Sequence, residues 1–282
     1  MCSMVFVAVY YLIQSHTIQS VFMNGLGFLN IELSSRCNKK CAMCGRRKLE
    51  REYPSLVDWG DMEFDVVKQI AREVPKGITV QFHSNGESLL HPRFGDCISL
   101  FRNNIRCLDT NGKLILEKFD EVCLLETLTI SVVQDDPEGD EQHETVTKFL
   151  SLKGDRPPNM VYRLLGKVDD DPWSRLPGIV ARRILHSPDG SFNYQKNPTI
   201  PEIGICLDLL THLAIDRYGN ASACVRFDPE GHLKLGNIKE RTLYSMWTGL
   251  KRKTYIQKHI EGKRHELPGC KSCEYWGVPR GE

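Results

Sequence analysis

The chain has 282 residues, of which 41% are hydrophobic and 26% charged, and its net charge at pH 7 is +1. This composition excludes a fibrous or disordered protein and is sufficient for one large domain with a small second unit. The balanced charge gives no global field that would attract nucleic acid or an anionic membrane, so neither is an expected partner. Seven of the eleven cysteines fall into two metal-type groups, which indicates a reducing compartment, and we expect a cytoplasmic protein.

Residues 1–25 are predicted to be an N-terminal extension. The apolar run from Met4 to Ile13 is short for a membrane span, and no Lys or Arg precedes it as in a signal peptide. No membrane span is therefore predicted. A translation start at Met23, a disordered extension and a docking helix are the alternatives for this segment.

From Phe28 onward, short β-rich segments alternate with longer segments whose apolar residues recur every three or four positions. This alternation predicts an α/β fold, with a parallel sheet and crossover helices, over residues 26–186. Six such units make a partial, TIM-like (β/α)6 barrel. The predicted strands are Phe28–Leu33, Ile78–Phe82, Ile105–Leu108, Thr127–Val132, Met160–Leu165 and Arg182–His186. The predicted helices are Met62–Val74, Phe94–Asn103, Leu114–Cys123 and Glu141–Leu152.

Three cysteines follow the first predicted strand within eight residues: Cys37, Cys41 and Cys44. Three thiolates can hold a [4Fe–4S] cluster by three irons and leave the fourth iron open to a small chelating ligand. A zinc knuckle or three unrelated buried thiols are the alternatives. The C-x3-C-x2-C spacing resembles that of the radical S-adenosylmethionine enzymes. The resemblance implies that S-adenosylmethionine binds the open iron and is cleaved reductively to a 5′-deoxyadenosyl radical.

The segment from His83 to Pro92, after the second predicted strand, resembles the Gly-Gly-Glu-Pro motif of the same superfamily. The resemblance implies that Asn85, Gly86 and Glu87 bind the amino group of S-adenosylmethionine, which needs carboxylate and carbonyl acceptors. A glycine at 86 would let the backbone approach the ligand closely. The alternative is an ordinary loop with a solvent-facing Glu87.

Further cofactor contacts are implied by the same resemblance. Met43 would pack against the adenine ring, and Ser131 and Gln134, at the end of the fourth predicted strand, would contact the ribose and carboxylate. A core methionine and a polar strand end are the alternatives. A basic residue is expected near the sixth strand as the base for a substrate hydroxyl, and Arg183 and His186 are its candidates.

The stretch 187–204, rich in Pro, Gly and Asn, is predicted to be a connector to a second unit over residues 205–282. This unit is predicted to begin with a hairpin, in which the segments His212–Asp216 and Ala221–Val225 flank a turn. A helix from Leu243 to Ile260 should follow. The predicted second unit is therefore a small β-hairpin plus helix.

A second group of cysteines lies in this unit and comprises Cys206, Cys224, Cys270 and Cys273. With the segment Leu235–Trp247, its spacing resembles the shortened, "twitch" form of the SPASM extension of radical S-adenosylmethionine enzymes. The resemblance implies a second, auxiliary [4Fe–4S] cluster. Four thiolates close every iron, which favours an electron relay over a substrate-binding centre. A structural zinc is the alternative, since zinc accepts the same four thiolates.

These resemblances imply an oxidoreductase most similar to the small dehydrogenases of aminocyclitols such as 2-deoxy-scyllo-inosamine. Such an enzyme would take a hydrogen atom from a sugar- or cyclitol-like alcohol and pass an electron to the auxiliary cluster. Flavodoxin or ferredoxin would be its reductant. Two alternatives stay open: a peptide maturase that forms a crosslink or thioether, and a non-catalytic iron–sulfur or zinc protein.

Overall fold

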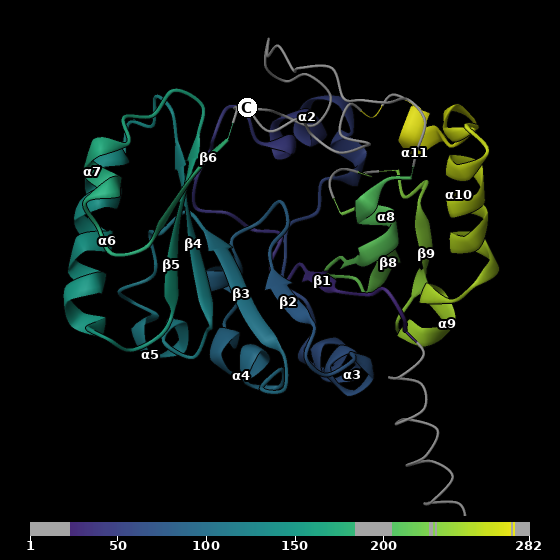
Figure 1. The fold of residues 1–282 in the computed structure, drawn as a ribbon, viewed down its shortest axis with the longest axis horizontal. Coiled ribbons are helices and arrows are strands. Elements are labelled where there is room, and N and C mark those ends of the chain that lie inside the picture. Colours follow the sequence, from purple (N-terminus) through teal and green to yellow (C-terminus); the bar gives the residue numbers. More distant parts are fainter. Residues whose placement is uncertain (1–22, 184–204, 226–227, 229, 272, 274–282) are drawn as a thin grey trace, which may run out of the picture.

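The computed structural model describes residues 23–183, 205–225, 228, 230–271 and 273. In this part of the chain the strands form one nine-stranded sheet, in the order β6-β5-β4-β3-β2-β1-β7-β8-β9. The sheet is open, because β6 and β9 are its two edges (Figure 1). The predicted α/β partial barrel is confirmed.

The first six strands run parallel, each paired with its neighbour in sequence. They are β1 (Phe28–Ile31), β2 (Thr79–Phe82), β3 (Ile105–Thr110), β4 (Thr127–Val133), β5 (Asn159–Leu165) and β6 (Ile179–Arg183). The prediction for the sixth strand, Arg182–His186, began too late. Ile179 already pairs with Val161, and this partly exposed edge strand lacks the buried apolar run that marks the inner strands.

Helices line the outer face of this sheet (Figure 1). They are α3 (Phe64–Glu73), α4 (Phe94–Ser99), α5 (Phe119–Val122), α6 (Gly139–Lys153) and α7 (Asp171–Ser174). Helix α2 (Gly45–Glu52) lies apart from them, at the top of Figure 1. The helix predicted over Leu114–Cys123 is regular only in α5. Its first half forms turns, after Gly112 adopts a left-handed φ of 83°.

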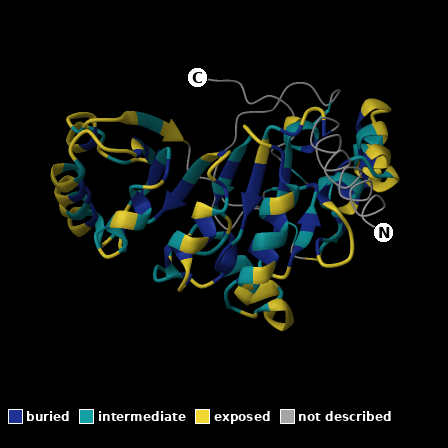
Figure 2. Cartoon of the chain, turned by 90° about the horizontal axis from the view of Figure 1, so that it is seen from below, coloured by how far each residue is buried: buried dark blue, intermediate teal, exposed yellow. Residues whose placement is uncertain are grey.

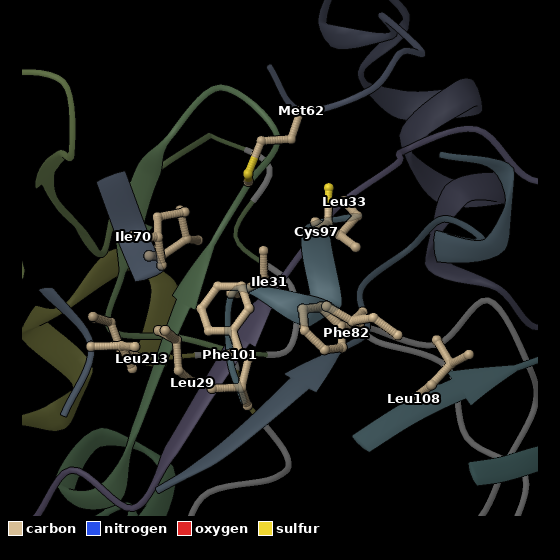
Figure 3. Close-up of a cluster of buried hydrophobic side chains, with 14 of the residues drawn as sticks. Leu29, Ile31, Leu33, Met62, Ile70, Phe82, Cys97, Phe101, Leu108 and Leu213 are labelled. Atoms are coloured by element: carbon tan, nitrogen blue, oxygen red, sulfur yellow. The ribbon is translucent and has the colours of Figure 1, made fainter. Parts of the chain in front are cut away.

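The core lies between the sheet and the helices, where inward side chains of adjacent strands meet. Leu29, Phe82 and Leu108 from three neighbouring strands belong to it and have no exposed surface (Figure 3). Buried and partly buried positions alternate along β2 and β5, whereas the outer faces of the helices are exposed (Figure 2). The core therefore holds the strands in place, and their carboxyl ends are free to carry functional loops.

The C-terminal part continues the same sheet. Its elements are α8 (Leu207–Thr211), β7 (His212–Ile215), β8 (Asn220–Ser222), β9 (Lys234–Asn237), α9 (Leu243–Trp247), α10 (Leu250–Ile260) and α11 (Pro268–Lys271). Strands β7 and β8 form the predicted hairpin, and β7 also pairs in parallel with β1, from Phe28 opposite His212 to Ile31 opposite Ile215. This pairing links residues about 180 positions apart in the sequence and attaches the hairpin to the barrel.

The long C-terminal helix is interrupted, contrary to the prediction of one helix from Leu243 to Ile260. Gly249 has an extended ψ of 158° and separates α9 from α10. A Cβ at this position would lie 2.6 Å from the carbonyl oxygen of Ser245. The break therefore depends on glycine. In the described residues, no helix has the length and apolar character needed to cross a membrane.

Candidate functional site

Cys37, Cys41 and Cys44 lie in the segment between β1 and α2, which we call the three-cysteine loop (residues 34–44). The backbone closes on itself here, since Cys44 N donates to Cys41 O at 3.2 Å and α2 begins at the next residue. Burial, followed by the neighbouring thiol of Cys44, raises the pKa of Cys41 to about 11. The charges of Cys37 and Cys44 both act on Cys41, so the fold brings the three thiols together.

Two cations hold the three-cysteine loop in place. Lys39 forms an ion pair with Asp136, and only 7% of either side chain is exposed. The buried guanidinium of Arg46 donates to the carbonyl oxygen of Ser35 and stacks 3.8 Å from the ring centre of Trp59. Our sequence analysis missed these residues; their basic side chains next to the cysteines were the available signal.

The His83–Pro92 segment packs directly against the three-cysteine loop. Glu87 N donates to Arg36 O at 2.7 Å. A Cβ on Gly86 would lie only 1.9 Å from the carbonyl oxygen of Ser34. The structure thus explains why residue 86 is a glycine: its backbone contacts the three-cysteine loop, whereas the sequence analysis expected it to approach the ligand.

The carboxylate of Glu87 is buried, with 2% of the residue exposed, so the alternative of a solvent-facing Glu87 is wrong. It accepts hydrogen bonds from Leu89 N at 3.1 Å, Thr110 Oγ1 at 2.8 Å and Asn111 N at 3.0 Å. Burial raises the pKa of Glu87, and these three donors act in the opposite direction. Glu87 therefore ties its own loop to the end of β3.

Asn111 continues this link to the cysteines. Its side-chain amide donates to Asn38 Oδ1 at 2.8 Å and lies 4.0 Å from the sulfur of Cys37. Gln142 of α6 in turn donates to the Asn111 carbonyl at 2.7 Å. The loops after β1, β2 and β3 therefore form one connected network around the first cysteine group.

Three predicted cofactor contacts lie near this network. Met43 is partly buried within the three-cysteine loop. Ser131 lies on β4, and its carbonyl accepts from Gln142 at 3.1 Å. Gln134 follows β4, where its amide oxygen accepts from Lys167 N at 2.9 Å. The amide of Gln134 is thus engaged with the loop after β5, and a direct cofactor contact stays a prediction.

Among the described residues, no enclosed site contains either candidate base. Arg183 is exposed at the end of β6, where its carbonyl accepts from Gly166 N at 2.9 Å. The neighbouring Arg182 forms an ion pair with Asp170. His186 lies outside the described residues.

Cys206, Cys224, Cys270 and Cys273 line one small cavity of about 40 Å³, which we call the auxiliary site. Cys206 directly precedes α8, Cys224 follows β8, Cys270 lies in α11 and Cys273 lies just beyond it. Leu209, Ala223 and Leu233 make much of the remaining wall apolar. Burial and the three other cysteines raise the pKa of Cys270 to about 12. The thiols of Cys206, Cys224 and Cys273 all act on that of Cys270, and thiols gathered in this way favour a positively charged metal group as their common ligand.

The donor sets of both sites suit iron–sulfur clusters. Three converging thiols leave one iron open, and four thiols around a cavity can close every iron. In the described part of the chain, no group of three or more His, Cys, Asp or Glu side chains is arranged to hold a metal ion. The fit therefore rests on the convergence of the thiols and on the cavity that they surround.

A larger cavity of about 400 Å³, the central cavity, extends between the two cysteine sites. Asn85 lines it on the side of the His83–Pro92 segment, and Cys224 lines it on the side of the auxiliary site. Asn30, Glu32 and His83, at the carboxyl ends of β1 and β2, are also part of its wall. Ligands of parallel β/α folds bind at this edge of the sheet.

Residues 206–274 match the model of the SPASM family, described as an iron–sulfur cluster-binding domain. The match begins at the first cysteine of the auxiliary site and includes all four. Together with the partial barrel and the three-cysteine loop, it supports the class of radical S-adenosylmethionine proteins of the SPASM type.

Two curated proteins are similar to part of the chain. The tungsten-containing aldehyde ferredoxin oxidoreductase cofactor-modifying protein of Pyrococcus furiosus is 32% identical over 96 residues, which are 32% of this chain and 25% of that protein. The FeMo cofactor biosynthesis protein NifB of Methanocaldococcus infernus is 28% identical over 117 residues, 38% of each chain. The similarity thus spans well under half of either relative.

Solved structures resemble nearly the whole chain. BtrN in complex with AdoMet and 2-DOIA has a TM-score of 0.55 at 17% identity, over 91% of this chain and 96% of BtrN. SuiB of Streptococcus suis bound to S-adenosylmethionine has a TM-score of 0.58 at 14% identity, over 93% of this chain and 76% of SuiB. At these identities the likeness establishes the fold.

Proposed function

We propose that this chain is a radical S-adenosylmethionine oxidoreductase that acts on a small polar alcohol of the sugar or cyclitol class. The observation that carries the proposal is the central cavity, which reaches from Asn85, beside the three-cysteine loop, to Cys224 of the auxiliary site. A substrate in this cavity would lie between a centre that starts radical chemistry and a centre that accepts an electron. The thiol-rich sequence favours a reducing, cytoplasmic setting.

The proposed roles fall at the two ends of the central cavity, with cofactor binding at one end and electron acceptance at the other. Cys37, Cys41 and Cys44 would hold a cluster with one open iron. When bound there, this cluster supplies the electron that splits S-adenosylmethionine into methionine and a 5′-deoxyadenosyl radical. We propose Met43, Asn85, Gly86, Glu87, Ser131 and Gln134 as contacts of the cofactor.

The auxiliary site supplies the second half of the proposed oxidation. Its four cysteines leave no open iron, and its apolar wall keeps water away from the thiolates. The electron left on the substrate, once a hydrogen atom and a proton are removed, would pass to this site. Arg183 and His186 stay our candidates for the proton acceptor, and flavodoxin or ferredoxin for the reductant.

Peptide modification is the second candidate function. The chain shares its fold with SuiB, and one SuiB structure is described as bound to the precursor peptide SuiA, with a TM-score of 0.53 at 14% identity. A peptide with a reactive side chain in the central cavity would meet the same two cysteine sites.

The first experiment measures iron, acid-labile sulfide and zinc per chain after anaerobic reconstitution. A variant with alanine at Cys37, Cys41 and Cys44 is the control. About eight irons, falling to about four in the control, are expected for two [4Fe–4S] clusters. About four irons with one zinc would make the auxiliary site structural and would remove the oxidoreductase proposal.

The second experiment separates the two candidate functions. The reduced protein is incubated with S-adenosylmethionine and either polyols or short peptides, and 5′-deoxyadenosine and the products are measured. Oxidation of an alcohol to a ketone supports the oxidoreductase. A peptide crosslink or thioether, with no oxidised alcohol, would replace it by the maturase.

A further inference from the structure

Asn30 places an unpartnered polar group in the wall of the central cavity. Leu29 and Ile31, on either side of it in β1, are core residues (Figure 3). Because side chains alternate along a strand, Asn30 points to the opposite face of the sheet, where it lines the cavity. Only 7% of Asn30 is exposed, and among the described residues its Oδ1 has no hydrogen-bond partner. A buried amide oxygen without a donor costs free energy, so a ligand that donates a hydrogen bond here would be stabilised.

Glu32 presents a carboxylate to the same part of the central cavity. Its backbone N–H donates to Ile215 O at 2.9 Å, which fixes its position between β1 and β7. One carboxylate oxygen accepts from the backbone N–H of Arg217 at a long 3.3 Å. Glu32 takes part in no ion pair within the described residues, and the Arg217 guanidinium pairs with Asp58 at 2.5 Å. Burial raises the pKa of Glu32, whereas the Arg217 charge and a hydrogen bond from the Ser84 side chain act in the opposite direction.

The surroundings add further negative charge. The carboxylate of Asp216, which accepts from Tyr218 N at 3.0 Å and Asn220 N at 2.8 Å, is close enough to act on the charge of Glu32. Lys234 also lines the cavity and acts on Asp216. His83, which follows the neighbouring strand β2, also lines the cavity, and its side chain is partly exposed. Desolvation and the nearby Arg163 lower the pKa of His83, although Asp109 acts against them. The cations that line the cavity near these carboxylates are Arg217, which acts on the charge of Glu32, and Lys234.

We propose that Asn30 and Glu32 form a subsite of the central cavity that binds a primary ammonium group. An ammonium has three donors and a positive charge, which match an unpartnered amide oxygen and an unpaired carboxylate. The inference rests on the proposed function, since it takes the central cavity as the substrate site. It narrows the substrate to an amine-bearing molecule. The ammonium can belong to an aminated sugar or cyclitol, or to a lysine of a peptide.

Binding of matched probes tests this subsite. The reconstituted full chain, without reductant, is titrated calorimetrically with glucosamine and with glucose, which differ by one amino group. Charge-assisted hydrogen bonds predict at least about tenfold tighter binding of glucosamine. In Glu32→Gln, which keeps an acceptor for Arg217 N, the preference should shrink to about twofold or less. Glu117→Gln, at an exposed position outside the cavity, is the control and should keep the preference.

A second pair of probes identifies the kind of molecule that carries the ammonium group. The peptide acetyl-Gly-Lys-Gly-amide is compared with acetyl-Gly-Gln-Gly-amide in the same titration. A preference for glucosamine alone supports an aminated polyol, and a preference for the lysine peptide alone supports a peptide. Equal binding of amine and neutral probes in both pairs, or no binding of any probe, overturns the subsite.

The variants need a check on folding, given by iron content and thermal midpoint. If Glu32→Gln does not fold, Asn30→Leu replaces it and should likewise reduce the preference for the amine; an unchanged preference in a folded variant overturns the proposal. Formation of 5′-deoxyadenosine without any probe tests the proposed function separately. Amine binding without cofactor cleavage keeps the subsite and rejects the oxidoreductase, whereas oxidation of neutral and aminated polyols with equal affinity rejects the subsite alone.

Discussion

The two cysteine sites both offer thiol sulfur atoms as ligands, but one lies among charged side chains and the other in an apolar wall. The three-cysteine loop is held by charged contacts, such as Lys39 with Asp136 and Arg46 with the Ser35 carbonyl. The auxiliary site is instead set in an apolar wall that includes Leu209 and Leu233. Polar surroundings suit a centre that must exchange a charged ligand, and an apolar wall suits a closed centre that only gains and loses an electron.

The sites also differ in how the fold assembles them. The three-cysteine loop is local, since its cysteines lie within eight residues and connect one strand to one helix. The auxiliary site gathers cysteines from α8, the end of β8 and α11, and depends on the hairpin that pairs with β1. Damage to packing should therefore affect the auxiliary site more, and damage to loop contacts should affect the first site more.

The largest effect should separate the two sites by function. We expect Cys41→Ala to abolish formation of 5′-deoxyadenosine, because the open-iron cluster loses one of three ligands. Cys270→Ala should leave cofactor cleavage partly intact and stop substrate turnover. Both are measured by chromatography of reduced, reconstituted samples. Equal loss of cleavage in the two variants would contradict the division of roles.

A steric change should damage the first site selectively. In Gly86→Ala, the new Cβ meets the Ser34 carbonyl, so the loops must separate; we expect a loss of about 1–3 kcal/mol in the free energy of unfolding and weaker binding of S-adenosylmethionine. The matched control is Gly139→Ala at the start of α6, where a Cβ meets nothing within 4 Å. It should be neutral or stabilise by up to about 1 kcal/mol. Urea unfolding and equilibrium dialysis give the two quantities, and equal behaviour of the variants would refute the proposed contact.

A packing change should damage the auxiliary site selectively. Leu233 is 4% exposed and lines its cavity, so Leu233→Ala should destabilise the fold by about 2–5 kcal/mol and speed the loss of auxiliary iron in air. Leu152→Ala, at a position 54% exposed on α6, is the control and should change stability by at most about 0.5 kcal/mol. Iron release is followed by absorbance. Release at the wild-type rate in Leu233→Ala would argue against the protective role of the apolar wall.

The smallest effect should appear away from both sites, at Tyr162 of β5. Its hydroxyl donates to Pro177 O at 2.8 Å, and Tyr162→Phe should lose about 1 kcal/mol at pH 8. Burial raises the pKa of Tyr162 to about 12, so the folded protein keeps this proton while the unfolded chain releases it above about pH 10. The advantage of wild type over the variant should therefore shrink as pH rises from about 10 to about 12. Paired urea titrations check this, and a constant difference would contradict the buried, hydrogen-bonded phenol.

Local sequence patterns predicted much of the fold. Strands β1 to β5 lie within two residues of their predicted bounds, because each contains a short run with apolar residues at its buried positions. The edge strand β6 was predicted too late in the sequence, and the helix break at Gly249 was not predicted. An exposed edge has no such run, and one glycine in a helical pattern does not show whether its neighbours leave room for a side chain.

By itself, the sequence determined the two groups of metal-ligand cysteines and the SPASM match, since cysteine spacing depends on neighbours along the chain. Only the tertiary structure decided how the sites relate. It joined β7 to β1, set Gly86 against Ser34, engaged Glu87 with Thr110 and Asn111, and left Asn30 and Glu32 facing one cavity. These contacts join segments far apart in the sequence, and sheet register and packing density, which no local pattern encodes, determine them.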